Sequence, residues 1–187
     1  MIQRRTILLA TGTLVIAGCS TSSSGTSDPA AKRREIDASV DNALAQLYGK
    51  VQGSRELGDK ARGILVMPKV VSAGFVIGGS YGQGALRKHG VTAAYYSVGA
   101  GSVGLLAGAE SKSMYMMFMT DDALKNFQQS KGWTAGVDGS IAVATIGANG
   151  QLDTNTAKAP IIGFVLTNAG LMGNLSLEGT KISKLDI

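Results

Sequence analysis

The stretch Gly78-Gly-Ser-Tyr-Gly82 contains the pattern G-x-S-x-G, which in serine hydrolases places the nucleophile on a sharp turn between a strand and a helix. That chemistry needs a carboxylate and then a histidine later in the chain. His89 is the only histidine, and no Asp or Glu lies between Ser80 and His89. We therefore expect no hydrolase, although a carboxylate drawn from elsewhere would leave a different order open.

Other catalytic and cofactor chemistry also lacks its residues. One histidine and one cysteine cannot form a zinc site. The chain has no G-x-x-x-x-G-K-[ST] phosphate loop, and Gly82-Gln-Gly84 is not followed by the third glycine of a dinucleotide fingerprint. A net charge of +5 with 5% aromatic residues is a weak footprint for nucleic acid. The sequence thus predicts a non-enzymatic protein with no cofactor, no metal and no nucleic-acid partner.

The first 18 residues predict a lipoprotein signal peptide. Two arginines precede residues 7–17, an apolar run that is too short to span a bilayer. The following Ile16-Ala17-Gly18-Cys19 resembles the lipobox of bacterial lipoproteins, in which the cysteine is acylated. Ser20 stands where an aspartate tends to retain enterobacterial lipoproteins at the inner membrane, so we expect the outer membrane, with the domain facing the periplasm. The alternative is an ordinary secretory signal with a chance cysteine.

Residues 19–31 are rich in Ser, Thr and Gly and predict a flexible tether to a domain over residues 32–187. That domain begins with a helical pattern from about residue 31 to residue 49. Its apolar residues form one stripe: Ile36, Val40, Leu44, Leu47 and Val51. Two interpretations stay open: the stripe packs on the domain's own core, or the helix also meets a membrane surface through its basic first turn.

Positive charge concentrates in the half of the domain nearest the predicted anchor. Residues 32–88 hold ten Lys or Arg and five Asp or Glu, whereas residues 89–187 hold six and seven. Basic residues near a bilayer are attracted to anionic headgroups by about 1 kcal/mol each. The asymmetry favours an anionic membrane as partner, and the alternative is a solvated basic face without a partner.

The rest of the domain predicts short strands with frequent glycines. Residues 64–67 predict a buried strand that Pro68 stops, and residues 114–119 predict a second core strand. Further apolar or glycine-punctuated segments predict the remaining strands, over residues 70–86, 92–109, 133–146, 161–166 and 171–177. Glycines inside strands are typical of bulged, sharply coiled strands.

Two further helices are predicted. Ser54 caps the first, over residues 55–61, and Thr120 caps the second, over residues 121–130. The predicted fold class is α+β. N-terminal helices pack on a glycine-rich, strongly coiled antiparallel β-sheet or small barrel, with one inserted helix.

Residues 61–84 resemble a known family signature. They read Ala-Arg-Gly-Ile-Leu-Val-Met-Pro-Lys-Val-Val-Ser-Ala-Gly-Phe-Val-Ile-Gly-Gly-Ser-Tyr-Gly-Gln-Gly. The SYLF signature similarly has Lys/Arg-Gly, an apolar strand, Pro, a short polar step and Gly-Phe-x-x-Gly-Gly-x-x-Gly-x-Gly. The preceding helix and the later strands match in order, so the resemblance covers roughly residues 32–187. On this interpretation Gly78–Gly82 is family scaffold and not a nucleophile elbow.

The resemblance implies phospholipid binding. Eukaryotic SYLF members bind phosphoinositides and act at membrane and actin structures, with a basic amphipathic N-terminal segment in the lipid contact. The matching positions here are Lys32, Arg33, Arg34, Ile36, Val40 and Leu44. Phosphoinositides are generally scarce in bacteria, so we expect an anionic phospholipid membrane as partner and Cys19 as the lipidation site. The alternative is a structural lipoprotein that binds another cell-envelope protein, with incidental lipid affinity.

Overall fold

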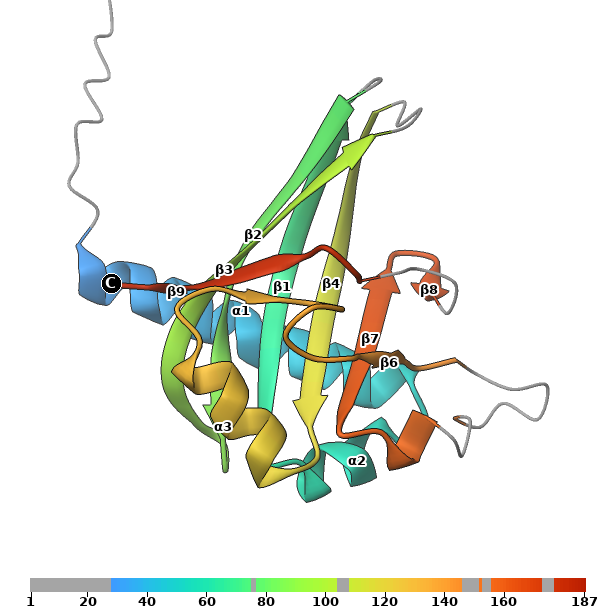
Figure 1. Cartoon of the computed structure of the whole chain (residues 1–187). Helices are drawn as coiled ribbons and strands as arrows, with labels where there is room; N and C mark the ends of the chain where they lie inside the picture. Colours follow the sequence, from blue (N-terminus) through green and yellow to red (C-terminus); the bar gives the residue numbers. More distant parts are fainter. Residues whose placement is uncertain (1–27, 75–76, 104–107, 146–151, 153–155, 173–176) are drawn as a thin grey trace, which may run out of the picture.

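The computed structural model describes residues 28–74, 77–103, 108–145, 152, 156–172 and 177–187. The predicted signal peptide, Cys19 and most of the predicted tether lie outside these residues. The described residues form an α+β fold in which helices pack on a strongly curled sheet (Figure 1). No helix among them is long and apolar enough to cross a membrane.

The described residues contain three α-helices: α1 (Pro29–Lys50), α2 (Ser54–Lys60) and α3 (Asp121–Gln129). The Asp28 carboxylate caps α1, and Thr120 caps α3 as predicted, because each side chain accepts a hydrogen bond from a first-turn N–H. The prediction that Ser54 caps α2 is wrong. Gly53 holds the cap position in the left-handed conformation, and the buried Ser54 hydroxyl donates instead to the Val51 carbonyl at 2.6 Å.

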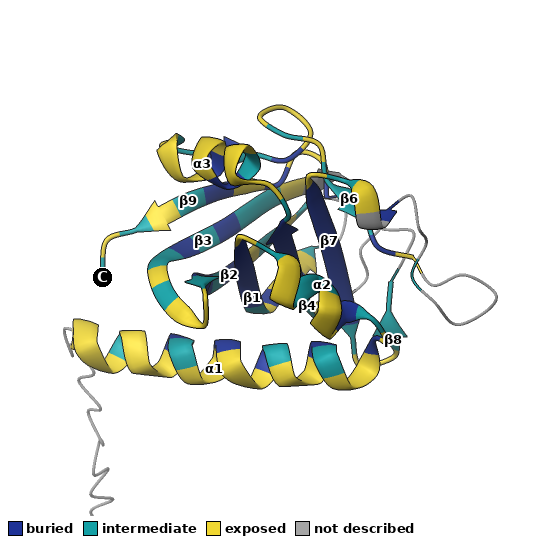
Figure 2. Ribbon diagram, turned by 90° about the horizontal axis from the view of Figure 1, so that it is seen from below, coloured by how far each residue is buried: buried dark blue, intermediate teal, exposed yellow. Residues whose placement is uncertain are grey.

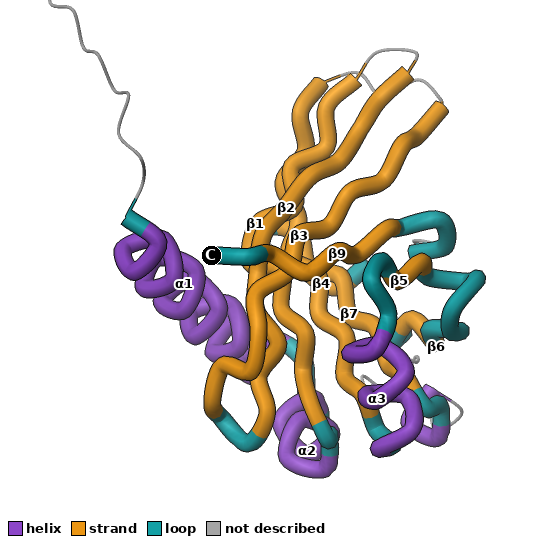
Figure 3. The backbone as a smooth tube through the Cα atoms, turned by 60° about the vertical axis from the view of Figure 1, so that its left-hand side comes forward, coloured by secondary structure: helices purple, strands orange, loops and turns teal. Residues whose placement is uncertain are grey.

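Nine described strands form one mixed sheet. Their bounds are β1 (Gly63–Gly74), β2 (Ile77–Lys88), β3 (Val91–Val103), β4 (Gly108–Phe118), β5 (Trp133–Thr134), β6 (Ala142–Val143), β7 (Ile161–Thr167), β8 (Gly170–Leu171) and β9 (Lys181–Leu185). The order is β5-β9-β3-β2-β1-β4-β7-β6, and β8 pairs with β7. Only the β6–β7 pair is parallel among these strands. The curled antiparallel centre confirms the predicted fold class, and β1 to β4 extend beyond the helices (Figure 3).

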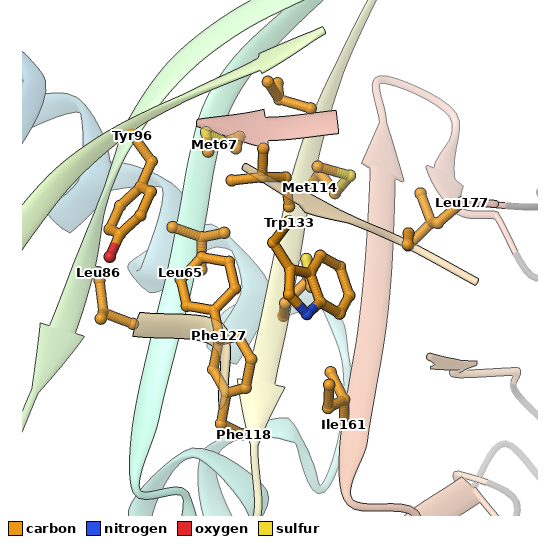
Figure 4. Packing of buried hydrophobic residues seen from close by; sticks show 14 of the residues in the cluster. Leu65, Met67, Leu86, Tyr96, Met114, Phe118, Phe127, Trp133, Ile161 and Leu177 are labelled. Atoms are coloured by element: carbon orange, nitrogen blue, oxygen red, sulfur yellow. The ribbon is translucent and has the colours of Figure 1, made fainter. Parts of the chain in front are cut away.

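The sheet has an apolar cluster on each face. On one face, α1 packs its stripe of Ile36, Val40, Ala43 and Leu47 against the strands (Figure 2). On the other face, Phe127 of α3 contacts Tyr96, Phe118 and Trp133, with ring centroids 4.8–5.7 Å apart (Figure 4). Every residue of both clusters lies between positions 36 and 187, so residues 28–187 hold the whole described core.

Strand β4 explains the methionine-rich run near the middle of the chain. Met114, Met116 and Phe118 belong to the cluster on the α3 side, whereas Tyr115 and Met117 belong to the α1 side. Because successive residues of a strand point to opposite faces, a strand covered on both faces is apolar at every position. The predicted strand over residues 114–119 is thereby confirmed as part of the core.

Two predicted strand segments each cover parts of two strands: residues 70–86 cover parts of β1 and β2, and residues 92–109 cover parts of β3 and β4. Two other strand predictions were too long. In the predicted segment 133–146, only Trp133–Thr134 and Ala142–Val143 are described strands. In the predicted segment 171–177, the only described strand residue is Leu171, which ends the short strand Gly170–Leu171. Residues 146 and 173–176 lie outside the described residues. Between β5 and β6 the chain turns instead, since Thr134 N–H donates to the Asp138 carboxylate at 2.6 Å. Glycine spacing alone did not distinguish such a turn from a bulged strand.

Candidate functional site

Strand β1 has a bulge at Met67 and Pro68, which shapes the candidate site described below. Val66 pairs with Ala85 and Lys69 pairs with Gln83, so two residues of β1 face one residue of β2. The prediction that Pro68 stops the strand is therefore wrong. A bulge accommodates proline because its missing N–H is not needed in the ladder. The Pro68 carbonyl accepts a hydrogen bond from the Ser113 hydroxyl at 2.7 Å.

Two glycines opposite the bulge make room for it. A Cβ atom on Gly84 would overlap the carbonyl oxygen of Val66, and one on Gly82 would lie 2.7 Å from the carbonyl oxygen of Lys69. Real Cβ atoms essentially never come that close. Gly82 and Gly84 of the Gly-Gln-Gly sequence are thus required by close backbone approach.

The bulge changes which residues of β1 face α1. Val70 packs in the cluster on the α3 side, so Val71 points to the α1 side. Val71 pairs with Tyr81 of β2, which points the same way. The relative exposures are 39% for Val71 and 55% for Tyr81, because α1 does not cover this part of the sheet.

A groove of about 710 Å³ lies between the N-terminal half of α1 and this bulged hairpin. The helix contributes Lys32, Glu35, Ile36 and Ser39 to its lining. The hairpin contributes Pro68, Lys69, Val71, Gly79, Ser80, Tyr81, Gly82 and Gln83. The groove thus combines an apolar wall with charged side chains at its rim.

The rim carries two lysines and one glutamate. Lys32 Nζ lies 3.2 Å from Glu35 Oε2, an exposed ion pair within one turn of α1. Lys69 is exposed and makes no ion pair with any residue that the structure describes. The local net charge is therefore +1, and an anion could take the place of Glu35 beside Lys32.

The other two predicted basic residues differ from Lys32. Arg33 Nε donates to the carbonyl oxygen of Ile187 at 2.9 Å and so holds α1 against the end of β9. Arg34 projects into solvent with its side chain 77% exposed, 4.0 Å from Asp28. Lys32 and Arg34 therefore present charge at the surface, whereas Arg33 is engaged in a structural contact.

The predicted apolar site residues belong mainly to the core. Ile36 and Val40 are 5% and 0% exposed, and Leu44 packs partly buried against the same cluster. The stripe thus packs on the domain's own core, which is the first of the two interpretations above. Ile36 also lines the inner side of the groove.

The opposite flank of α1 is held by a polar network that the sequence analysis did not identify. Arg87, with its side chain 12% exposed, donates to Asp41 Oδ1 and to Thr92 Oγ1, both at 2.6 Å. Asp37 accepts from the Thr92 hydroxyl at 2.7 Å and from the Tyr95 hydroxyl at 2.8 Å. Burial, and then the hydrogen bond to Asp37, raise the pKa of Tyr95.

The residues of the hydrolase pattern are not brought together. Ser80 lies inside β2, paired on one side with Ser72 and on the other with Ala100, so it is not on a strand-to-helix turn. His89 follows the end of β2, which puts about 27 Å of extended strand between the two residues. A Ser80–His89 pair is therefore excluded. Among the described residues, no three His, Cys, Asp or Glu side chains gather closely enough to hold a metal ion.

A comparison with protein families bears on the later part of the chain. Residues 99–186 match the family model described as Ysc84: Las17-binding protein actin regulator, which is the SYLF family. Residues 99–186 are therefore similar to the SYLF family. The match runs from β3 to β9, so the family is recognised from residues separate from the signature at 61–84. No curated protein matches the chain significantly.

The matched SYLF residues and the groove adjoin each other. Gly99 of β3 pairs with Tyr81 of β2, and β2 in turn pairs with the bulged β1. The groove itself lies on α1, β1 and β2, before the matched range. Sequence reasoning missed Lys69, Val71 and Tyr81 as site residues, and the signal that could have found them is Pro68 within a strand opposite Gly-Gln-Gly.

Proposed function

We propose that this protein binds anionic phospholipid membranes without catalysis, through the first turns of α1 and the adjoining groove. The observation that carries this proposal is the juxtaposition of Lys32 and Lys69 with the exposed Val71 and Tyr81. Cationic side chains beside an apolar wall complement a lipid, which has an anionic headgroup next to hydrocarbon. Similarity of residues 99–186 to the SYLF family, whose resemblance implies phospholipid binding, supports the same conclusion.

The electrostatic attraction to an anionic membrane would come mainly from three side chains, Lys32, Arg34 and Lys69. Lys32 and Lys69 line the groove, whereas Arg34 projects into solvent from the first turns of α1, outside the groove lining. Arg33 contributes less because it donates to the carbonyl oxygen of Ile187. Each cation near an anionic surface gains about 1 kcal/mol, and salt screens this attraction. We therefore expect binding that weakens as the salt concentration rises.

We further propose that acylated Cys19 anchors the protein to the outer membrane, with the domain in the periplasm. The sequence Ile16-Ala17-Gly18-Cys19 and the absence of aspartate at Ser20 support this assignment. More than one acyl chain is needed for lasting attachment. The groove would then contact the same membrane or an apposed one.

The family description favours a second candidate function. It names a Las17-binding actin regulator, which is a protein-binding activity. The corresponding proposal for this chain is a lipoprotein whose SYLF surface binds another cell-envelope protein, with incidental lipid affinity. It predicts that loss of the basic residues leaves envelope function intact.

Vesicle co-sedimentation of residues 28–187 tests the main proposal. Vesicles containing phosphatidylglycerol would be compared with pure phosphatidylcholine vesicles at low and high salt. The triple variant Lys32→Gln, Arg34→Gln and Lys69→Gln should lose up to about a hundredfold in affinity for the anionic vesicles. The matched control Lys125→Gln, Lys131→Gln and Lys158→Gln changes the net charge equally at three exposed lysines away from the groove.

Salt-sensitive binding by the wild-type chain and by the control, with loss in the Lys32, Arg34 and Lys69 variant, would support the proposal. Equal losses in both variants would mean that net charge alone drives binding. No binding to either vesicle would leave Cys19 as the only source of membrane affinity and would turn the search to protein partners.

A further inference from the structure

The groove is lined by exposed apolar side chains as well as by charged ones. Val71 and Tyr81 are two of the most exposed large hydrophobic side chains in the described part of the chain, and they lie directly opposite each other on β1 and β2. Pro68 and Ile36 continue the lining toward the helix. Covering such a wall with hydrocarbon removes apolar surface from water, which is favourable.

We propose that this groove holds one acyl chain of a single anionic amphiphile, with the headgroup between Lys32 and Lys69. The inference rests on the proposed function for the class of lipid. It adds that the groove takes up one molecule and does not only touch a membrane surface. The volume of about 710 Å³ lies within the roughly 300–1,000 Å³ of small-molecule sites.

The charges at the rim indicate which headgroup fits. Lys32 and Lys69 supply two positive charges and Glu35 supplies one negative charge, so the rim has a net charge of +1. A phosphodiester headgroup without an amine carries a single negative charge and complements this balance. On binding, its phosphate displaces the Glu35 carboxylate from Lys32 and also reaches the unpaired Lys69.

The groove has space because Gly79 has no side chain. Gly79 lies two residues before Tyr81 on the same face of β2 and lines the groove. Its neighbour Gly101 on β3 pairs with it directly but does not line the groove. A Cβ atom at Gly79 would lie 3.8 Å from the Ala100 carbonyl oxygen, and one at Gly101 would meet nothing within 4 Å. Either position therefore accepts a Cβ atom without a clash, and strands favour β-branched residues.

Calorimetric titration with lysophosphatidylglycerol, below the concentration at which it forms micelles, tests the inference on residues 28–187. This ligand has one acyl chain and an anionic phosphodiester. Lysophosphatidylcholine, with the same chain and a zwitterionic head, is the headgroup control. We expect one-to-one binding to the anionic ligand with a negative heat-capacity change, the signature of apolar burial.

Two variants locate the ligand. Gly79→Val fills the groove and should weaken binding at least about tenfold, whereas Gly101→Val on the neighbouring strand should change it less than about twofold. Replacing Lys69 with Gln should cost about fivefold and should bring the two lysolipids closer in affinity. Circular dichroism of each variant confirms that the fold is retained.

The result that overturns this inference is wild-type binding to phosphatidylglycerol vesicles with no binding to the monomeric lysolipid. That outcome leaves the proposed membrane binding standing. Binding that Gly79→Val leaves unchanged also overturns it, because the chain would then lie elsewhere. Monomer binding without vesicle binding would instead contradict the proposed function and support the groove as a single-lipid site.

Discussion

The two flanks of α1 carry similar polar residues, but one flank is bonded to the strands and the other borders a groove. Asp37 and Asp41 follow one another at an i, i+4 spacing and face Arg87, which closes that flank against β2 and β3. Lys32, Glu35 and Ser39 lie on the other side of the same helix and border the groove. The side with Asp37 and Asp41 is called the closed flank below, and the side with Lys32, Glu35 and Ser39 the open flank. Between the two flanks, the buried stripe fixes the helix to the sheet.

The difference arises from the strands and not from the helix. On the closed flank, Arg87, Thr92 and Tyr95 supply partners for the helix carboxylates. On the open flank, Lys32 and Glu35 pair with each other, and no strand residue that the structure describes makes an ion pair with either of them. One flank is therefore bonded to the strands, although the buried Arg87 Nε has no hydrogen-bond partner among the described residues, and the other presents its charges at the open groove.

The largest expected effect comes from removing the glycine that permits the bulge. Gly84→Ala places a methyl group on the Val66 carbonyl oxygen, so β1 and β2 must separate. We expect a loss of at least about 3 kcal/mol in the free energy of unfolding, measured by urea denaturation. Gly101→Ala, which meets nothing within 4 Å, should change it by less than about 0.5 kcal/mol. Equal stability of the two variants would show that the bulge does not depend on Gly84.

The next effect tests the closed flank. Asp37→Ala removes the acceptor of two hydroxyl groups and a charge 3.6 Å from Arg87 Nη2. We expect a loss of about 2 kcal/mol in the free energy of unfolding. Ser39→Ala, on the open flank of the same helix, should cost less than about 0.5 kcal/mol. A small cost at Asp37 would mean that the apolar stripe alone holds the helix.

A smaller effect tests the open flank. Glu35→Gln frees Lys32 from its intrahelical partner and should raise affinity for phosphatidylglycerol vesicles about fivefold. Asp41→Asn makes the same change in net charge on the closed flank and should leave this affinity nearly unchanged. Co-sedimentation of both variants separates local charge from overall charge. A decrease on Glu35→Gln would indicate that the carboxylate receives an ammonium group of the ligand.

The smallest effect concerns alkaline pH at the closed flank. Tyr95 has a pKa raised above 10.0 by burial and by its hydrogen bond to Asp37, so the unfolded chain releases this proton first. Its contribution to stability is complete below pH 10 and is lost as pH rises through the folded-state pKa. Tyr95→Phe should therefore flatten the alkaline decline in the melting temperature. An unchanged slope would assign the decline to other tyrosines, of which Tyr48, Tyr96 and Tyr115 also have raised pKa values.

Local signals in the sequence predicted much of this architecture. The α1 stripe recurs at helical spacing, and Thr120 precedes α3 as a cap, because both depend on neighbours within a few residues. The glycines of β2 indicated coiled strands. The prediction failed at Pro68, where the rule that proline ends a strand competes with the rule that bulges accommodate it.

The candidate site was only partly predictable for a related reason. Lys32 and Arg34 could be named because they lie in one basic turn of a helix. Val71 shares the α1 face with Tyr81 only because the bulge changes the alternation of β1, and recognising this requires the register of the strands. Similarly, Asp37 and Arg87 lie 50 residues apart in the chain, and no short-range pattern pairs them.

The most direct test of the central claim follows backbone amide resonances by nuclear magnetic resonance during titration with lysophosphatidylglycerol. We expect saturable shifts at Lys32, Glu35, Lys69 and Tyr81, with little change at Asp37, Asp41 and Arg87. Shifts confined to the closed flank, or spread evenly over the surface, would contradict the assignment of the open groove as the lipid site.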